Sequence, residues 1–352
     1  MITRRRLLSA AAIGSAAIHL PLKAASAPLR VSGFGGIFEQ TLKQTIVKAF
    51  TEETGIAVET VSQGTGDEWL FGMVRAVRAG LAPVDVTIFQ RVHLIRMMQM
   101  GELAHAYNMD AMPRAQELPE DYIFSHQGKT YGVGVMSWFQ TIVANTERLP
   151  NPPTSWLAMF QDERLKQRLS LLGWYSSGTL EILARTYLTD SAMTTRAGLD
   201  QVFAKLAEVK PKVKLWWTAE SQLEQALRTG EIYAGVYPHD VALSLIDQGF
   251  PIQSIFPEEG PLIGVGYFTS LRTSKKPLEA EAFVNFCARP DIQEMFARKM
   301  NLAPVRPRHE LSLSDAEFNR VSTELPPVFP AAEAMVSQAS LIQRQWQRTL
   351  TA

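Results

Sequence analysis

The sequence predicts an α/β protein of two lobes, in which two mixed sheets carry helices on both faces and two crossover strands join the lobes. Short apolar strands alternate with amphipathic helices along most of the chain, an order typical of mostly parallel sheets. Two long extended runs, residues 131–145 and 262–271, interrupt this order and are expected to cross between the lobes. The length of 352 residues is enough for two packed cores.

The composition is that of a globular protein, with 46% hydrophobic and 20% charged residues. Lys plus Arg and Asp plus Glu each total 35, and this balance argues against nucleic acid as a partner. The single cysteine, Cys287, excludes an intramolecular disulfide and is expected to be an inert buried thiol. The six histidines are scattered singly, and no Rossmann or P-loop glycine pattern occurs. We therefore expect no metal site and no cofactor.

Residues 1–27 have the three parts of an export signal. Arg4-Arg5-Arg6 form a charged start, a weakly hydrophobic run from Leu7 to Leu22 follows, and Ala25-Ser26-Ala27 fits a cleavage site. The arginine pair before apolar residues is similar to a twin-arginine signal, which a translocase for folded cargo reads. The run is shorter than the ~20 residues that a spanning helix needs, so an uncleaved anchor is the less favoured alternative. We expect a periplasmic protein.

The first α/β unit begins directly after this signal. Its predicted strands are residues 29–32, 56–61 and 84–89, and its predicted helices are residues 38–54, 67–80 and 92–100. In the first helix Leu42, Ile46 and Phe50 have helical spacing, and Gly55 ends it. Ligand sites on such sheets lie outside the carboxyl ends of the strands, a position that the loops 33–36, 62–66 and 89–91 occupy.

A second α/β unit follows the first extended run. Its predicted strands are residues 169–172, 213–216 and 232–237, and its predicted helices are residues 155–160, a helix from about 180, 199–208, 221–229 and 241–248. Helices at 278–288 and 292–299 follow the second extended run, and the tail from residue 315 is mixed polar helix. We therefore place one lobe at residues 28–135 with 268–310, the other at 136–267, and a C-terminal helical segment at 311–352.

Four segments in this order resemble the extracellular solute-binding proteins of ABC importers, in particular the spermidine/putrescine-binding branch. They are Phe50-Thr-Glu-Glu-Thr-Gly-Ile-Ala-Val58, Ala82-Pro-Val-Asp-Val-Thr-Ile88, Gly230-Glu-Ile-Tyr-Ala-Gly-Val-Tyr237 and Phe283-Val-Asn-Phe-Cys-Ala-Arg-Pro-Asp-Ile-Gln293. The resemblance covers nearly all of the chain after the export signal. It implies the type II periplasmic-binding fold, whose two lobes close on a solute by hinge motion, and no catalysis. It also implies a permease and an ATPase as partners, and we expect a monomer.

The resemblance leaves the charge of the solute open. Polyamine binders hold amines with carboxylates and aromatic faces. The family's acidic pair falls here on Trp174-Tyr175-Ser176-Ser177, and its aspartate on the return crossover falls near Tyr267. Asp240, Glu220 and Asp67 remain as candidate carboxylates near strand ends. We therefore expect a small polyamine-like solute, or a related amine or zwitterion of reduced charge.

Two features keep an anionic solute, such as a carboxylate or phosphonate, as an alternative. The segment from Ser176 to Thr179 stands at a predicted helix start, where free N–H groups either bind an anion or take an ordinary N-cap. Arg91 follows a strand, where it either pairs an anion bidentately or is a solvated charge. A hydrolase using Ser176 or Ser177 with His239 and Asp240 is less favoured, because no G-x-S-x-G motif occurs.

The candidate ligand site collects residues expected at strand ends and on the crossovers. Trp216 and Trp217 are neighbours on a strand and face opposite ways, so one of them is expected in the core. Tyr237 ends its predicted strand, and Asp240 either faces the solute or simply belongs to the start of the next helix. The candidate ligand-binding residues are Phe34, Gly35, Gln63, Gln90, Arg91, Trp138, Trp174, Tyr175, Ser176, Ser177, Trp217, Tyr237, Asp240 and Tyr267.

Overall fold

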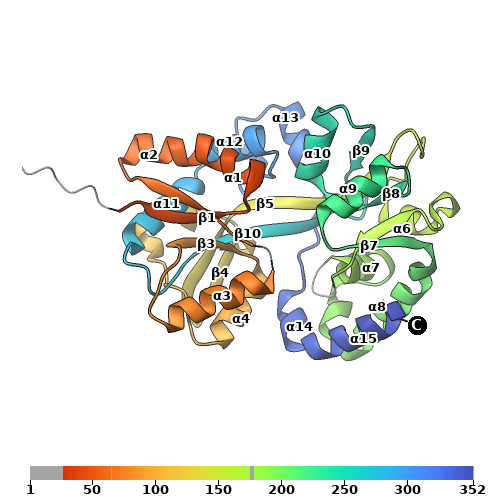
Figure 1. Ribbon diagram of the computed structural model, residues 1–352, viewed down its shortest axis with the longest axis horizontal. Coiled ribbons are helices and arrows are strands. Elements are labelled where there is room, and N and C mark those ends of the chain that lie inside the picture. Colours follow the sequence, from red (N-terminus) through yellow and green to blue (C-terminus); the bar gives the residue numbers. More distant parts are fainter. Residues whose placement is uncertain (1–26, 65, 175–177, 352) are drawn as a thin grey trace, which may run out of the picture.

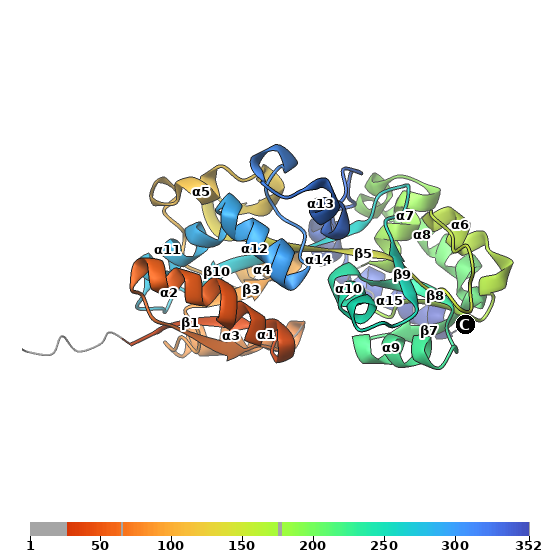
Figure 2. The ribbon, with the colours of Figure 1, turned by 90° about the horizontal axis from the view of Figure 1, so that it is seen from above.

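The computed structural model describes residues 27–64, 66–174 and 178–351, which form two α/β lobes side by side (Figure 1). The predicted α/β, two-lobed class is therefore confirmed. Seen from above, the long strands at the centre connect the lobes (Figure 2). Within the described residues no helix is long and apolar enough to cross a membrane.

One long strand, β5 (Lys129–Asn145), runs from the first lobe into the second. The strands order as β2-β1-β3-β10-β5-β8-β6-β7, with β4 and β9 also paired to β5. The prediction of two separate sheets is therefore wrong: the strands of both lobes form one ten-stranded sheet, because β5 pairs with strands of each lobe. The first-lobe strands are β1 (Leu29–Gly33), β2 (Val58–Ser62), β3 (Val86–Phe89), β4 (Ile123–His126) and the crossover β10 (Leu262–Ser270). The second-lobe strands are β6 (Leu169–Leu172), β7 (Val213–Trp217), β8 (Ala234–Pro238) and β9 (Ile252–Ile255).

Helices cover both lobes, and we name the lobes by their elements. Lobe 1 contains β1–β4 with α1 (Gly36–Leu42), α2 (Lys48–Thr54), α3 (Asp67–Arg78), α4 (Arg91–Gln99), α5 (Pro113–Gln116), α11 (Pro277–Cys287) and α12 (Pro290–Met300). Lobe 2 contains β6–β9 with α6 (Trp156–Gln161), α7 (Thr179–Tyr187), α8 (Arg196–Val209), α9 (Glu220–Arg228) and α10 (His239–Asp247). The lobe boundaries near residues 135 and 267 stay a prediction, because β5 and β10 run through them without a break.

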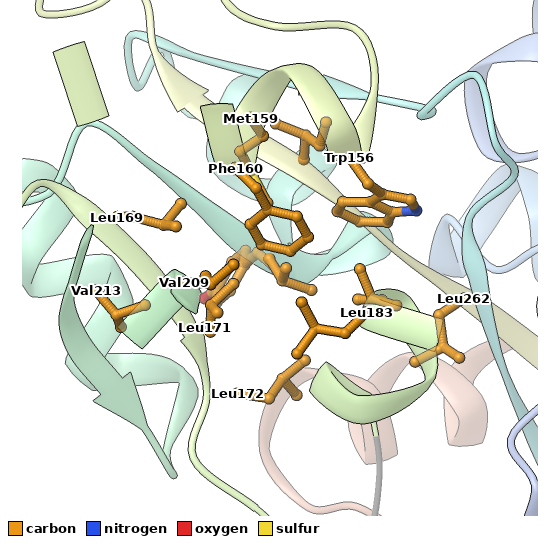
Figure 3. Close-up of a cluster of buried hydrophobic side chains, with 14 of the residues drawn as sticks. Trp156, Met159, Phe160, Leu169, Leu171, Leu172, Leu183, Val209, Val213 and Leu262 are labelled. Atoms are coloured by element: carbon orange, nitrogen blue, oxygen red, sulfur yellow. The ribbon is translucent and has the colours of Figure 1, made fainter. Parts of the chain in front are cut away.

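Each lobe has its own apolar core. In lobe 2, Trp156, Phe160, Leu171 and Leu183 pack together between α6, α7 and the sheet (Figure 3). In lobe 1, Phe283 packs edge-on against Phe50 at 5.1 Å and stacks on Phe268 at 6.0 Å. Cys287 is fully buried in the same core, and this burial raises the pKa of its thiol, as expected for an inert cysteine.

The C-terminal segment crosses between the lobes a third time. Helix α13 (Asp315–Val321) packs with α12 of lobe 1 and with Leu243 of α10 in lobe 2. Helix α14 (Ala332–Ser337) then packs on α4, and α15 (Ala339–Thr351) packs on α8. Met335, Ile342 and Trp346 belong to the lobe 2 core. Figure 1 shows α14 below the crossover strands, between α4 and α8. The tail therefore contacts both lobes.

Candidate ligand-binding site

The carboxyl ends of the parallel strands in one lobe face the carboxyl ends of the parallel strands in the other lobe. Strands β1, β2 and β3 are parallel, and so are β6, β7 and β8. Strand β3 is antiparallel to β10, β10 to β5, and β5 to β8, so β3 and β8 run in opposite directions. Because β5 runs from lobe 1 to lobe 2, β3 ends toward lobe 2 and β8 ends toward lobe 1. Ligands bind outside such strand ends, and we call this region the interlobe site.

Part of β5 forms the floor of the interlobe site. Phe89, the last residue of β3, pairs with Tyr267 of β10, and Tyr267 in turn pairs with Gly134 of β5. Pro238, the last residue of β8, pairs with Gln140 of β5. From Gly134 to Gln140 is six residue steps, about 20 Å at ~3.3 Å per residue. The ends of β3 and β8 are therefore well separated along β5.

Trp138 and Gln140 lie on the same face of this floor, since alternate strand residues point the same way. Both are half-buried, whereas their neighbours Ser137 and Phe139 are buried on the other face. Gly264 lies opposite Trp138 on β10, and a Cβ at this glycine would clash with the indole ring. The missing side chain at Gly264 therefore lets the Trp138 ring lie against the crossover strands.

Three aromatic rings form a corner at the strand ends of lobe 2. Trp217 is buried, and its indole N–H donates to the Val236 carbonyl at 3.0 Å. Its ring contacts Tyr237 edge-on at 5.9 Å and Trp174 at 5.6 Å. Trp174 keeps 39% of its surface exposed, whereas Tyr237 is fully buried. Trp174 therefore offers a face to a solute, and the other two rings support it.

Glycine at position 173 brings Trp174 to this corner. The Gly173 N–H donates to the Trp217 carbonyl at 2.7 Å. A Cβ on Gly173 would come within 3.0 Å of the carbonyl oxygens of Trp216 and Trp217. Trp216 faces the other way and packs on Trp346 of α15 at 5.6 Å, so the expectation that one of the two adjacent tryptophans is core is confirmed for Trp217.

Two carboxyl groups stand beside the aromatic corner. Asp240 lies in the first turn of α10, and its Oδ1 atom is buried with no hydrogen-bond partner among the described residues. Burial and the nearby charge of Glu220 raise the pKa of Asp240 to about 7. Burial also raises the pKa of Glu220, the first residue of α9. A bound cation would relieve both effects, because a carboxylate that has lost its water is stabilised by an opposite charge.

The charged residues at the strand ends of lobe 1 are paired within the protein. Arg91, the first residue of α4, donates from Nε to Oε1 of Glu333 on α14 at 2.8 Å. Burial opposes the charge of Arg91, but the hydrogen bond and charge of Glu333 outweigh it and raise its pKa. Asp67 pairs with Arg96. Arg91 is thus a partly exposed charge that is paired with Glu333.

Several other predicted site residues serve the protein's own structure. Gln63 is buried, and its side-chain amide bonds both the N–H and the carbonyl of Ile88, at 3.2 and 3.1 Å. This fastens the end of β3 to the end of β2. Gln90 is the N-cap residue of α4, and the Tyr267 hydroxyl donates to the Asp121 carbonyl at 2.6 Å.

The structure separates the predicted residues into two groups. Phe34, Gly35, Trp138, Trp174 and Asp240 keep exposed or unpartnered atoms at the interlobe site. Gln63, Arg91, Trp217, Tyr237 and Tyr267 have side-chain polar atoms or rings engaged by other residues, whereas Gln90 is engaged through its backbone N–H. Tyr175, Ser176 and Ser177 lie outside the described residues.

Gln140 is a further candidate on this floor that the sequence reasoning did not name. Its Oε1 atom is buried with no partner in the part of the chain that the structure describes. Its spacing of two from Trp138 on an extended run is a signal that could have found it. Glu220 was recognised only as a candidate carboxylate and not as part of the site.

His239 has no free ring nitrogen for hydrolysis. Its Nε2 contacts the Arg320 carbonyl at 2.7 Å and its Nδ1 contacts the Ser254 hydroxyl at 2.8 Å. Burial lowers the pKa of this histidine to about 4. Within the described residues, no group of His, Cys, Asp and Glu is placed to hold a metal ion.

A separate hollow of about 440 Å³ lies on the outer edge of lobe 2, away from the strand ends. Trp216 and Lys210 line it, and the Lys210 ammonium donates to the Thr349 carbonyl at 3.0 Å. The side chains that line this hollow include no carboxylate. The interlobe site, by contrast, has the unpartnered Oδ1 of Asp240.

A two-lobed protein with its strand ends facing one interlobe site has the architecture of a solute-binding protein. Residues 45–320 match the model of the family "Bacterial extracellular solute-binding protein", and the chain belongs to this family. The gamma-aminobutyric acid-binding protein of Pseudomonas aeruginosa is 23% identical over 292 residues, which cover 80% of this chain and 78% of that protein.

Solved structures show the same fold. A substrate-binding protein of an ABC transporter from Bradyrhizobium japonicum superposes with a TM-score of 0.78, 18% identity and coverage of 92% of this chain and 99% of that chain. The Atu4243-GABA receptor superposes with a TM-score of 0.75 and 18% identity, covering 92% of this chain and 98% of that chain. A spermidine/putrescine-binding protein from Streptococcus pneumoniae superposes with a TM-score of 0.70 and 15% identity, covering 92% of this chain and 100% of that chain.

These comparisons confirm the type II periplasmic-binding fold and the resemblance seen in the sequence. The chain is an extracellular solute-binding protein of this family. Proteins of this class bind solutes and are not enzymes, so the hydrolase alternative is excluded.

Proposed function

We propose that this protein captures a small amine-bearing solute of reduced charge, in the class of zwitterionic ω-amino acids, for import from the periplasm. The observation that carries the proposal is the pair of Asp240 and Glu220 beside the exposed ring of Trp174. Carboxylates and an aromatic face are the groups that attract an ammonium ion. Lobe 1 complements this with half-buried Phe34 and Gly35.

A single ammonium group suits this site better than two. The raised pKa of Asp240 means that Asp240 and Glu220 together carry less than two negative charges near pH 7. A polyamine also needs an acid for its second ammonium, and Asp67 of lobe 1 is already paired with Arg96. A monoamine whose other end is a carboxylate or a neutral group therefore fits better than spermidine.

The relatives support an amine without deciding which one. The names of two of them state gamma-aminobutyric acid, and that of a third states spermidine and putrescine. Others were solved with agropinic acid and glucopine. Since solutes differ so widely among similar folds, the choice rests on the side chains of this site. The anionic alternative is weakened because Arg91 is bound to Glu333.

A binding screen of residues 28–352 tests the proposal. The panel contains 4-aminobutyrate, 5-aminopentanoate, putrescine, spermidine and amine-free butyrate and succinate. We expect the amino acids to raise the melting temperature most, since a ligand at 100 times its dissociation constant adds ~2.7 kcal/mol. Stabilisation by succinate or butyrate and not by any amine would refute the proposal.

Residues 1–27 are proposed to direct export through the twin-arginine route. The support is the arginine pair before Leu7 and Leu8 and the Ala25-Ser26-Ala27 site. Replacing Arg4 and Arg5 with Lys should leave full-length precursor in the cytoplasm, detected by fractionation and immunoblotting. Unchanged export of the double variant would indicate the Sec route instead.

A further inference from the structure

Residues 328–335 of the C-terminal tail connect the two lobes, and we call them the tail seam. Val328 is buried in the lobe 2 core. The ring of the next residue, Phe329, packs on the apolar cluster that α3 and α4 form over the lobe 1 sheet, and meets the Tyr122 ring edge-on at 6.4 Å. Two adjacent residues are therefore bound to different lobes.

Helix α14 repeats this alternation. Its Glu333 accepts a hydrogen bond from Arg91 of α4 in lobe 1 at 2.8 Å, whereas Met335 belongs to the lobe 2 core. Beyond α14 the tail stays with lobe 2, because α15 packs on α8 and buries Ile342 and Trp346 in that core. The tail seam thus has lobe 2 anchors at both ends and lobe 1 anchors between them.

The crossover strands form a narrow ribbon beside the tail seam. Strand β5 pairs with β4 up to Val133 and with β8 from Gln140 onward, and between these residues it pairs with β10. A ribbon of two strands twists more strongly than a wider sheet. Val328 bridges Leu262 of β10, and its carbonyl accepts from the Ile263 N–H at 2.9 Å. The tail seam therefore borders the part of the sheet that has to deform when the lobes move.

We propose that the tail seam is a third hinge element, which confines the lobes to rotation about it and prevents them from separating or twisting there. Separation would pull the Phe329 ring from lobe 1, or Val328 and Met335 from lobe 2, and would expose apolar surface to water. Rotation about the tail seam keeps both sets of contacts. This inference holds for any solute and does not rest on the proposed function.

The rival to this inference is that the tail is a lobe 2 element whose contacts with lobe 1 are incidental. Removal of incidental contacts would leave the spread of interlobe distances unchanged. Removal of a hinge element widens that spread, because the ribbon alone then resists twisting and bending. The two alternatives therefore differ in a quantity that can be measured without a solute.

Double electron–electron resonance between nitroxide labels measures this spread. The labels are placed at Arg75→Cys on α3 and Gln225→Cys on α9, both exposed, and the native Cys287 is buried. Phe329→Ala combined with Glu333→Gln removes both lobe 1 anchors and leaves the lobe 2 anchors in place. We expect this double variant to give a distance distribution at least ~1.5-fold wider than that of the wild-type protein.

A control variant makes the same two changes within lobe 2. Phe250→Ala alters a ring that packs on the lobe 2 core, and Glu163→Gln removes the surface ion pair with Lys212. The control should leave the width of the distribution unchanged. If Phe329→Ala is unstable, Phe329→Leu, which keeps an apolar side chain but removes the ring, replaces it in the double variant.

A second label pair shows whether lobe 2 itself stays intact. Labels at Gln225→Cys and at Gln343→Cys on α15 should give the same narrow distribution in the wild-type protein and the double variant. The third hinge is overturned if the interlobe width is unchanged in the double variant or if the control variant widens it equally. Widening within lobe 2 would also overturn it, since the tail would then be leaving that lobe.

Discussion

Arg91 and Asp240 occupy similar places, each in the first turn of the helix that follows a parallel strand, yet their surroundings differ. Glu333 binds Arg91 at 2.8 Å, whereas the Oδ1 of Asp240 has no partner in the described part of the chain. A charge that is already paired contributes little to recognition of a ligand. We therefore expect the charge of the solute to be recognised by lobe 2 and not by Arg91.

Asp240 should make the stability of the protein depend on pH, and its replacement should change stability and amine binding in opposite directions. Its pKa of about 7 lies above the usual ~3.9, so the folded ligand-free protein holds a proton that the unfolded chain loses between about pH 4 and 7. Stability therefore falls as pH rises through this window. Asp240→Asn should raise the free energy of unfolding at pH 7 by roughly 1–3 kcal/mol, seen in urea denaturation, while calorimetry shows amine binding at least ~10-fold weaker.

Asp247→Asn is the control for this change, because it alters another aspartate of α10 that pairs with Arg320 on the surface. It should leave amine binding unchanged and lower stability by less than ~1 kcal/mol. Equal losses of binding in Asp240→Asn and Asp247→Asn would indicate a general effect on α10 and not a contact with the solute.

The ion pair of Arg91 and Glu333 should be structural. Arg91→Ala and Glu333→Gln each remove it, and because both side chains are partly exposed we expect a loss of ~1 kcal/mol or less from either. Amine affinity, measured by calorimetry, should change less than ~3-fold in both variants. A large loss with Arg91→Ala but not with Glu333→Gln would show that Arg91 contacts the solute, in favour of an anionic ligand.

At the scale of elements, the crossover strands position the floor of the site. Gly264 of β10 leaves room for the Trp138 ring, and any side chain there would clash with it. Gly264→Ala should therefore displace the ring, weaken solute binding, and lower stability by ~1–3 kcal/mol. Tryptophan fluorescence, calorimetry and urea denaturation measure the three effects.

Gly72→Ala provides the comparison for Gly264→Ala. Gly72 lies inside α3 with open space around its Cα, so an added methyl group should stabilise the helix by ~0.5–1 kcal/mol without affecting binding. If Gly264→Ala proved equally harmless, the close contact between β10 and Trp138 would not be what sets the floor.

Periodicity predicted most elements well. The helices predicted at 67–80, 92–100, 221–229 and 241–248 begin and end within two residues of α3, α4, α9 and α10. Strands β4 and β9 were missed because two of the four residues in each are polar, so neither has the apolar run that marks β6. The turn between β4 and β5 did carry a signal, since Gln127 and Gly128 both have positive φ, as tight hairpins require.

The site was harder to predict than the fold. The sequence places aromatic residues at strand ends, but packing decides which ring is exposed, and this distinguishes Trp174 from Trp217 and Tyr237. The partner of Arg91 lies 242 residues further along the chain, so no local pattern could reveal it. The orphan atoms of Gln140 and Asp240 likewise become visible only once burial is known.

For the molecule as a whole, the C-terminal tail is part of the lobe 2 core. Ile342 and Trp346 of α15 are buried, whereas Gln343 is exposed. Ile342→Ala should lower the free energy of unfolding by ~2–5 kcal/mol through the cavity it leaves, measured by urea denaturation. Gln343→Ala on the same helix should change it by less than ~0.5 kcal/mol. Equal effects would mean that α15 does not pack as described.

The third crossing also decides where the chain ends. Two crossings would return the C-terminus to lobe 1, beside the N-terminus, but the tail carries it to lobe 2 instead. The described chain therefore starts on one lobe and finishes on the other, at opposite sides of the molecule (Figure 1). Fluorescent proteins fused to residue 28 and residue 352 would thus be attached to separate lobes. Energy transfer between them would report solute capture directly, without a reporter inserted into either lobe.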